Sequence, residues 1–167
     1  MKLSFNSQKV IDWSGSILVL GIFENNVESE IDAFSNTLNS NLLKEILSEK
    51  DFSGKSGQHC SFDFTDASFK KLVLVGLGKA EKVSLCELRK ATALGCKASS
   101  GYSGKLGISF PWDKFDQIQS INAVGESARL SIFKDIRFLS DPKPKKYPEE
   151  LEIIGISETS ERQILKL

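Results

Sequence analysis

Few side chains in this 167-residue chain combine reactivity with the neighbours that catalysis needs. His59 is the only histidine, so a Ser-His-Asp or Cys-His site would have to use it. Polar and apolar residues alternate from His59 onward, which predicts a strand with His59 and Cys60 on opposite faces. We therefore interpret His59 as a surface or hydrogen-bonded histidine rather than as a catalytic base.

The three cysteines, Cys60, Cys86 and Cys96, are scattered along the chain. A zinc site needs about four nitrogen or sulfur ligands within reach of one another. Cys86 and Cys96 fall on one predicted helix, too far apart to share a metal ion. An odd number of cysteines without a C-x-x-C pair is typical of reduced thiols in the cytosol. We expect Cys86 and Cys96 to be small residues of the core or of the helix surface.

Two groups of carboxylates have the spacing of an acid–base pair or a metal site. Asp63 and Asp66 form one group, and Glu28, Glu30 and Asp32 form the other. Neither group has a second type of ligand nearby in the sequence. Solvated charge is the interpretation that the sequence favours.

A glycine-containing turn, Gly76-Leu77-Gly78-Lys79, follows a strongly apolar segment, which is where phosphate-binding loops occur. The dinucleotide pattern requires a further glycine where Glu81 stands, and the P-loop pattern requires Ser or Thr where Ala80 stands. The next helix begins late, near Ser84. The sequence predicts a strand-ending turn rather than a phosphate cradle.

The charges are balanced, with 22 basic and 22 acidic residues. A net charge of zero provides no general attraction to nucleic acid or to an anionic membrane. A small basic cluster, Lys143, Lys145 and Lys146, lies beside Glu149 and Glu150 and is typical of a solvated linker. Nucleic acid is therefore not an expected partner.

No apolar run is long enough to span a bilayer, the longest being strand-sized at 17–23. The polar N-terminal residues do not resemble a signal peptide. We expect a cytoplasmic protein without a membrane partner.

Apolar segments alternate with helical patterns along the chain. Two segments are apolar on both faces, as expected for strands covered by helices on both sides, and two others alternate. This order predicts an α/β domain with a mixed, mostly parallel sheet. The expected strands cover 17–23, 60–64, 72–75, 106–110 and 151–156; the expected helices cover about 30–49 with a break near 40, 84–100 with a capping box at its start, and 118–132; a proline-rich linker covers 141–148.

Five segments, in this order, resemble the N-terminal domain of cytosolic leucyl aminopeptidases, a family of metallo-aminopeptidases. Lys71–Lys79 is similar to the family's "vllvGlGk" strand and turn, and Leu88–Ala91 to the helix that starts "lRka". The other three are Trp13–Gly21, similar to the opening tryptophan turn and strand, Asp51–Gly57, similar to the "dF.Gk.G" loop, and Gly125–Leu130, similar to the "eGa.L" helix with Gly and Glu exchanged.

This resemblance implies a three-layer α/β/α fold similar to macro domains over residues 1–155. Residues 156–167 would begin a connecting helix toward a C-terminal catalytic domain that this chain lacks. The parent enzyme would release N-terminal residues, leucine preferred, from peptides with two divalent metals, manganese or zinc. The family's metal ligands lie in the C-terminal domain, so we expect no catalytic, cofactor-binding or metal-binding residue in this chain.

The resemblance also implies an accessory role: packing on the chain's own catalytic domain and assembly of a homo-hexamer. The fragment alone should be inactive. Two alternatives remain open from the sequence. One is a stand-alone macro-like module that binds ADP-ribose or a related nucleotide, suggested by the turn at 76–79. The other is a DNA-binding or assembly domain, suggested by the lysine cluster.

Overall fold

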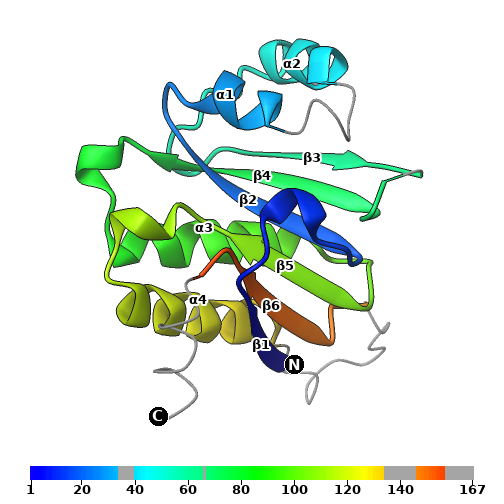
Figure 1. Cartoon of the computed structure of the whole chain (residues 1–167), viewed down its shortest axis with the longest axis vertical. Helices are drawn as coiled ribbons and strands as arrows, with labels where there is room; N and C mark the ends of the chain where they lie inside the picture. The colour runs from blue at the N-terminus through cyan, green and yellow to red at the C-terminus, as the bar shows by residue number, and fades with distance from the viewer. Residues whose placement is uncertain (34–39, 66, 134–145, 157–167) are drawn as a thin grey trace, which may run out of the picture.

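The computed structural model describes residues 1–33, 40–65, 67–133 and 146–156. In this part of the chain, six strands form one sheet in the order β1-β6-β5-β2-β4-β3 (Figure 1). All neighbouring strands are parallel except the β3–β4 pair, which is antiparallel. The strands are β1 (Lys2–Asn6), β2 (Ile17–Phe23), β3 (His59–Asp63), β4 (Lys71–Gly78), β5 (Lys105–Ser109) and β6 (Glu150–Ile154).

Helices cover both faces of the sheet. α3 (Leu85–Ala98) and α4 (Gln117–Ile132) pack together on one face. α1 (Val27–Asp32) and α2 (Ser40–Glu49) pack on the other face, over β2, β3 and β4. Three short 3₁₀ turns complete the described part: η1 (Val10–Asp12), η2 (Ala80–Lys82) and η3 (Trp112–Lys114). The predicted three-layer α/β/α domain with a mixed, mostly parallel sheet is confirmed.

The central strand β2 is apolar on both faces because it contributes to two separate cores. Ile17 and Val19 point to the α3/α4 side, whereas Leu18 and Leu20 point to the α1/α2 side. Successive side chains of a strand alternate between faces, so a strand between two helical layers needs apolar residues at every position.

Local capping and close packing fix the position of α3. The Ser84 hydroxyl accepts a hydrogen bond from the backbone N–H of Glu87, which satisfies one unpaired donor of the helix start. Within α3, Gly95 lies against β2, where an added Cβ would be 2.7 Å from Val19 Cγ1. The small residue therefore allows the helix to approach the sheet closely.

The structure differs from the sequence prediction at several elements. β1 was not expected; it is the last strand of the sheet among the described residues, and its partner β6 lies nearly 150 residues away in the sequence. The segment 30–49 contains parts of two helices, with α2 beginning at the predicted break. The antiparallel pair of the mixed sheet is β3 with β4. Of the predicted connecting helix over 156–167, residues 157–167 lie outside the described residues, as do the linker residues 141–145.

Candidate functional site

The glycine turn after β4 is packed against another loop. The backbone N–H of Gly76 donates to the carbonyl oxygen of Gln58, and that of Gly78 donates to Gly54, each at 2.9 Å. A Cβ added to Gly76 would lie 2.0 Å from the carbonyl oxygen of Lys55. A phosphate cradle requires free backbone N–H groups, and these two are already bound. The glycines of the turn therefore let its backbone pack directly against the backbone of the loop at 54–58.

The loop at 51–58, which carries the "dF.Gk.G" segment, is organised by the side chain of Gln58. Its amide oxygen accepts hydrogen bonds from the backbone N–H groups of Ser53 (3.0 Å) and Lys55 (3.1 Å). Its amide nitrogen donates to the carbonyl of Asp51 at 2.8 Å. Gly54 has φ +79°, and a Cβ there would lie 2.7 Å from the carbonyl oxygen of Phe23. The positive φ and the close backbone contact of Gly54 therefore explain why glycine occupies this position.

The crevice where a doubly wound sheet usually binds ligands is filled by aromatic side chains. β2 and β5 are neighbours, and the helices that follow them lie on opposite faces of the sheet, which defines this position. Phe110 and Trp112 follow β5 directly and are both 4 % exposed. A Cβ at Gly21 would lie 2.4 Å from Phe110 Cδ1, and the Trp112 indole N–H donates to the carbonyl of Ile154 at 2.7 Å.

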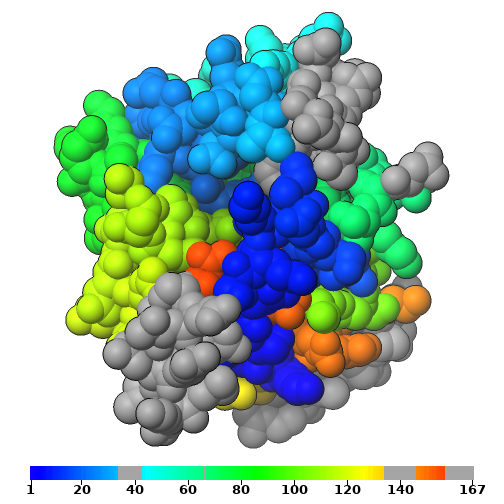
Figure 2. Space-filling model, viewed as in Figure 1, coloured from blue at the N-terminus to red at the C-terminus, as the bar shows by residue number. Residues whose placement is uncertain are grey.

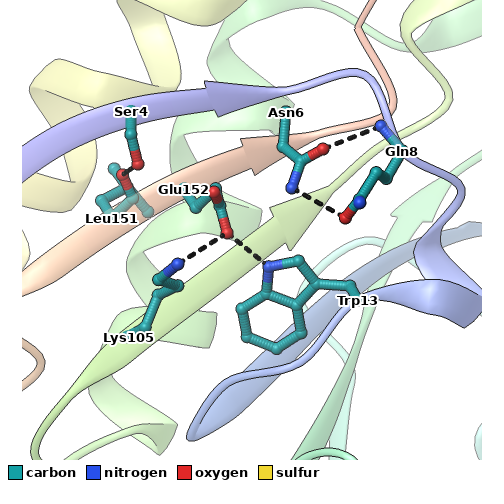
Figure 3. Close-up of polar contacts among 7 residues, drawn as sticks. All are labelled: Ser4, Asn6, Gln8, Trp13, Lys105, Leu151 and Glu152. Carbon is teal, nitrogen blue, oxygen red and sulfur yellow. Dashed lines mark hydrogen bonds and ion pairs between the residues drawn. The ribbon is translucent and has the colours of Figure 1, made fainter.

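A partly buried polar cluster joins three distant segments on the α1/α2 side of the sheet (Figure 3). The indole N–H of Trp13 donates to Glu152 Oε2 at 2.6 Å, and Lys105 Nζ lies 3.5 Å from the same oxygen. Trp13 is 1 % exposed and Glu152 is 8 % exposed. The sequence patterns do not predict this cluster; the single acidic residue inside the apolar segment 151–156 is the only signal of it. In Figure 2 the N-terminal residues lie over the middle of this face, below α1.

His59 and the three cysteines do not form a common site. His59 is exposed at the start of edge strand β3, and Cys60 is buried on the opposite face. Cys96 is buried within α3, where burial raises the pKa of its thiol to about 12, whereas Cys86 on the same helix is exposed. All three cysteines are free thiols.

Asp63 belongs to a surface contact between β3, β4 and the turn before β5. Its carboxylate accepts a hydrogen bond from the Tyr102 hydroxyl at 2.5 Å and lies 3.4 Å from Lys71 Nζ. The Tyr102 hydrogen bond, followed by the Lys71 charge, holds the pKa of this carboxyl below its usual value. Lys71 Nζ also lies 5.1 Å from the centre of the Tyr102 ring. The predicted partner, Asp66, lies outside the described residues.

The acidic residues of α1 do not converge either. Asp32 pairs with Lys44 of α2 at 2.6 Å, and partial burial raises the pKa of Glu30. Within the described ranges, no three or more His, Cys, Asp or Glu side chains form a group that could hold a metal ion. Of the lysine cluster, Lys146 is exposed, and Lys143 and Lys145 lie outside those ranges.

No helix in the described part of the chain is both long and apolar enough to cross a membrane. This finding comes from the four described ranges alone.

Comparison with known proteins gives a consistent result. A family model described as the cytosol aminopeptidase family, N-terminal domain, matches residues 19–142. Two probable cytosol aminopeptidases of Prochlorococcus marinus are similar: that of strain MIT 9211 is 42 % identical over 100 % of this chain and 34 % of its own length. That of strain MIT 9313 is 40 % identical over 91 % of this chain and 31 % of its own length. The chain thus spans about a third of the length of these relatives.

Solved structures show the same relation. A mutant of tomato leucine aminopeptidase superposes with a TM-score of 0.78 at 26 % identity, over 99 % of this chain and 35 % of that one. A bottromycin maturation enzyme, solved in complex with Mn, has a TM-score of 0.61 at 16 % identity, over 90 % of this chain and 28 % of that one; at this identity the likeness concerns the fold alone. The chain therefore belongs to the cytosol aminopeptidase family, within which it corresponds to the N-terminal domain.

Proposed function

We propose that this chain is the accessory N-terminal domain of a leucyl aminopeptidase that removes N-terminal residues, leucine preferred, from peptides. In this proposal the polypeptide that follows the domain carries out the hydrolysis with two divalent metals, manganese or zinc. The observation that carries it is the alignment of nearly the whole chain with about a third of a leucine aminopeptidase. The chain itself serves interdomain packing and the assembly of a hexamer.

The packing of the described residues supports a structural role over a nucleotide-binding role. The crevice between β2 and β5 is filled by Phe110 and Trp112, and the N–H groups of Gly76 and Gly78 are bound by backbone carbonyls. A ligand would have to displace groups that the fold already uses.

The cellular location and the metals of the parent are also proposals. The names of the two Prochlorococcus relatives support a cytoplasmic enzyme. The Mn of the bottromycin maturation enzyme belongs to a structural neighbour and supports a metal-dependent parent only through the shared fold.

The first test is an activity assay. The purified 167-residue chain should not hydrolyse leucine p-nitroanilide in the presence of Mn²⁺ or Zn²⁺. The longer product of the same gene should hydrolyse it, and EDTA should abolish the activity. Chelator-sensitive hydrolysis by the 167-residue chain would place catalytic groups inside it and overturn the proposal.

The second test is the coding sequence after the codon for Leu167. We expect it to continue into a domain that contains the Lys, Asp and Glu ligands of a two-metal site. A stop codon directly after Leu167 would contradict the accessory role and favour an independent binding module.

A further inference from the structure

A pocket of about 290 Å³ lies between α1, α2 and the loop at 51–58. Figure 1 shows α1 and α2 next to each other at one end of the molecule, and the two helices are in contact. We call this cavity the α1/α2 pocket; its lining includes Asn25, Val27, Glu28, Leu47, Ser48 and Phe52. Pockets for drug-sized ligands measure about 300–1,000 Å³, so this one suits a smaller molecule.

The floor of the α1/α2 pocket is apolar. Leu47 and Phe52 line it and also belong to the hydrophobic core on this side of the sheet, where they are 3 % and 8 % exposed. Val27, the first residue of α1, is half-buried and packs against the same core. An apolar group that enters the pocket would therefore leave water and contact side chains that core packing already fixes.

Hydrogen bonds of the backbone hold the walls of the pocket in place. The turn after β2 is closed by the N–H of Asn26, which donates to the carbonyl of Phe23 at 3.2 Å. At the end of α2, the N–H of Phe52 donates to the carbonyl of Leu47 at 2.9 Å, and the Gln58 side chain fixes the loop that follows. Because these walls are formed before binding, a ligand loses little affinity to the ordering of the protein.

The charged groups of the pocket leave one carboxylate without a partner. Lys44, which lines the pocket, has its Nζ 2.6 Å from Asp32 Oδ1, and this ion pair joins α2 to α1. The Glu28 side chain also lines the pocket and makes no hydrogen bond or ion pair with the other residues of the described ranges. The lining, together with its ion pair, therefore presents one uncompensated negative charge.

Neutral oxygen atoms add to this carboxylate. Asn25, with φ +69° just before α1, contributes a side-chain amide to the lining. Ser48 and Ser53 contribute hydroxyl groups; that of Ser53 donates to Gln58 Oε1 at 3.3 Å, which leaves the lone pairs of its oxygen to accept. An ammonium group has three donors and no acceptor, so carboxylate, amide and hydroxyl oxygens are the partners that suit it.

We propose that the α1/α2 pocket binds a small organic cation: a primary ammonium group that pairs with Glu28, attached to a branched apolar group that lies on Leu47 and Phe52. Charge complementarity favours a cation over an anion, since Lys44 is already paired with Asp32. The apolar floor disfavours a bare inorganic cation, which would lose hydration there without gaining polar contacts. Two sources share this chemistry, a free aliphatic amine and the N-terminal residue of a peptide. The site does not depend on the proposed function.

An NMR titration of the 167-residue chain with isopentylamine tests the inference. Backbone amide signals of Val27, Glu28 and Ser48 should shift and reach saturation, with a dissociation constant in the millimolar range because the ligand is so small. The neutral isostere isopentyl alcohol should bind about tenfold more weakly, because a charge-assisted hydrogen bond is stronger than a neutral one. The anion isovalerate, which has the same branched carbon chain, should bind more weakly still.

A substitution at the carboxylate tests the role of charge. Glu28→Gln should weaken the binding of isopentylamine about tenfold and leave that of the alcohol unchanged. The matched control is Glu30→Gln, two positions further along α1 and therefore on the other side of the helix, outside the lining. It should change neither affinity. An equal loss in the two variants would assign the effect to the general charge of this surface and overturn the inference.

A third variant tests whether the ligand lies inside the pocket. Ser48 is exposed on α2 and lines the pocket, so Ser48→Trp would fill the cavity without removing a core side chain. It should abolish the binding of isopentylamine and of the alcohol while the urea midpoint of unfolding stays unchanged. Unchanged binding in this variant would place the ligand elsewhere and contradict the inference.

The remaining outcomes concern the kind of ligand. Equal affinities for amine and alcohol would show an apolar crevice without a cation site, tighter binding of isovalerate would make Lys44 the anchor, and shifts without saturation would show no site. Each of these would overturn the inference. Leucinamide distinguishes the two sources, because it adds the amide of a peptide N-terminus to the same branched group and ammonium. Tighter binding than that of isopentylamine would assign the pocket to a peptide N-terminus, and weaker binding to a free amine; either supports the cation site.

Discussion

Trp13 and Glu152 form a contact between the two ends of the described chain. A carboxylate buried in a sheet is costly unless it is paired and hydrogen-bonded. Here the indole N–H at 2.6 Å and the Lys105 ammonium at 3.5 Å meet the same oxygen. The acidic residue therefore links the segment before β2 to β5 and β6, and its partners come from parts of the sequence that are far apart.

Trp13→Phe should destabilise the chain more than Trp112→Phe does. Both variants remove a similar volume and one indole hydrogen bond. The Trp13 bond goes to a carboxylate and the Trp112 bond to a backbone carbonyl. Hydrogen bonds to charged groups contribute about 1.5–3 kcal/mol, against about 0.5–1.5 for neutral ones, so the difference should be on the order of 1 kcal/mol. Urea unfolding measures it, and equal losses would contradict a charge-assisted bond.

The Asp63 contact predicts a pH dependence in acid. The Tyr102 hydroxyl, and then Lys71, hold the pKa of Asp63 below its usual value, so the folded state favours the ionised carboxylate. The stability from this group is present above the usual Asp pKa and is lost as the pH falls through the lowered folded pKa. Tyr102→Phe should raise the pKa of Asp63 toward its usual value in an NMR titration.

Glu87 provides the internal control for that titration. Hydrogen bonds from Lys90 and Ser56 lower the pKa of its carboxyl, and none of these groups contacts Tyr102. The titration of Glu87 should be the same in the wild-type chain and in Tyr102→Phe. An unchanged Asp63 pKa would show that the Tyr102 hydrogen bond does not lower it.

Among the elements, the loop at 51–58 shows why a recurring short motif need not be a ligand site. Its carbonyl groups accept hydrogen bonds from β4. The Gln58 side chain stabilises the shape of the loop by hydrogen bonds to the loop's own backbone. The glycines at 54 and 76 allow the two backbones to touch. The motif could be recognised from the sequence, but its partner could not, because the contact joins segments about 20 residues apart through backbone atoms.

Gly76→Ala should destabilise this contact much more than Gly57→Ala. Gly57 has φ +86° with no atom within 4 Å of an added Cβ, so alanine there suffers only backbone strain, roughly 1–2 kcal/mol. At Gly76 the added Cβ would lie 2.0 Å from a backbone oxygen, and the loss should reach or exceed about 3 kcal/mol, the upper end for overpacking. Thermal or urea unfolding of both variants measures the difference. A smaller loss at Gly76 would mean that the loop is free to move away.

At the scale of the whole molecule, the fold has the position for a ligand but fills it with its own side chains. The crevice between the carboxyl ends of β2 and β5 lies at the switch point of the sheet. Phe110 occupies it against Gly21, and Trp112 is fixed to β6 by a hydrogen bond. A fold of this kind can therefore serve as a rigid support without binding a small molecule at that position.

Calorimetric titration with ADP-ribose should give no binding heat with the 167-residue chain. Binding would require Phe110 and Trp112 to leave a packed core, and removing such a large aromatic side chain from a core costs about 3–5 kcal/mol. Saturable heat would contradict the filled crevice. In that case loss of the heat in Lys79→Ala, with no loss in Lys146→Ala, would locate the site at the turn after β4.

The sequence by itself determined the strands at 17–23, 72–75 and 106–110, the capped helix from Ser84, and the family, because each rests on local periodicity or on an ordered set of short motifs. It did not reveal β1, the Trp13–Glu152–Lys105 cluster, the aromatic filling of the crevice or the exposed apolar side chains at the end of α4. These features depend on which segments become neighbours in space. Only the tertiary structure decides that, because strand order and the exposure of a helix side are set by packing among residues distant in the chain.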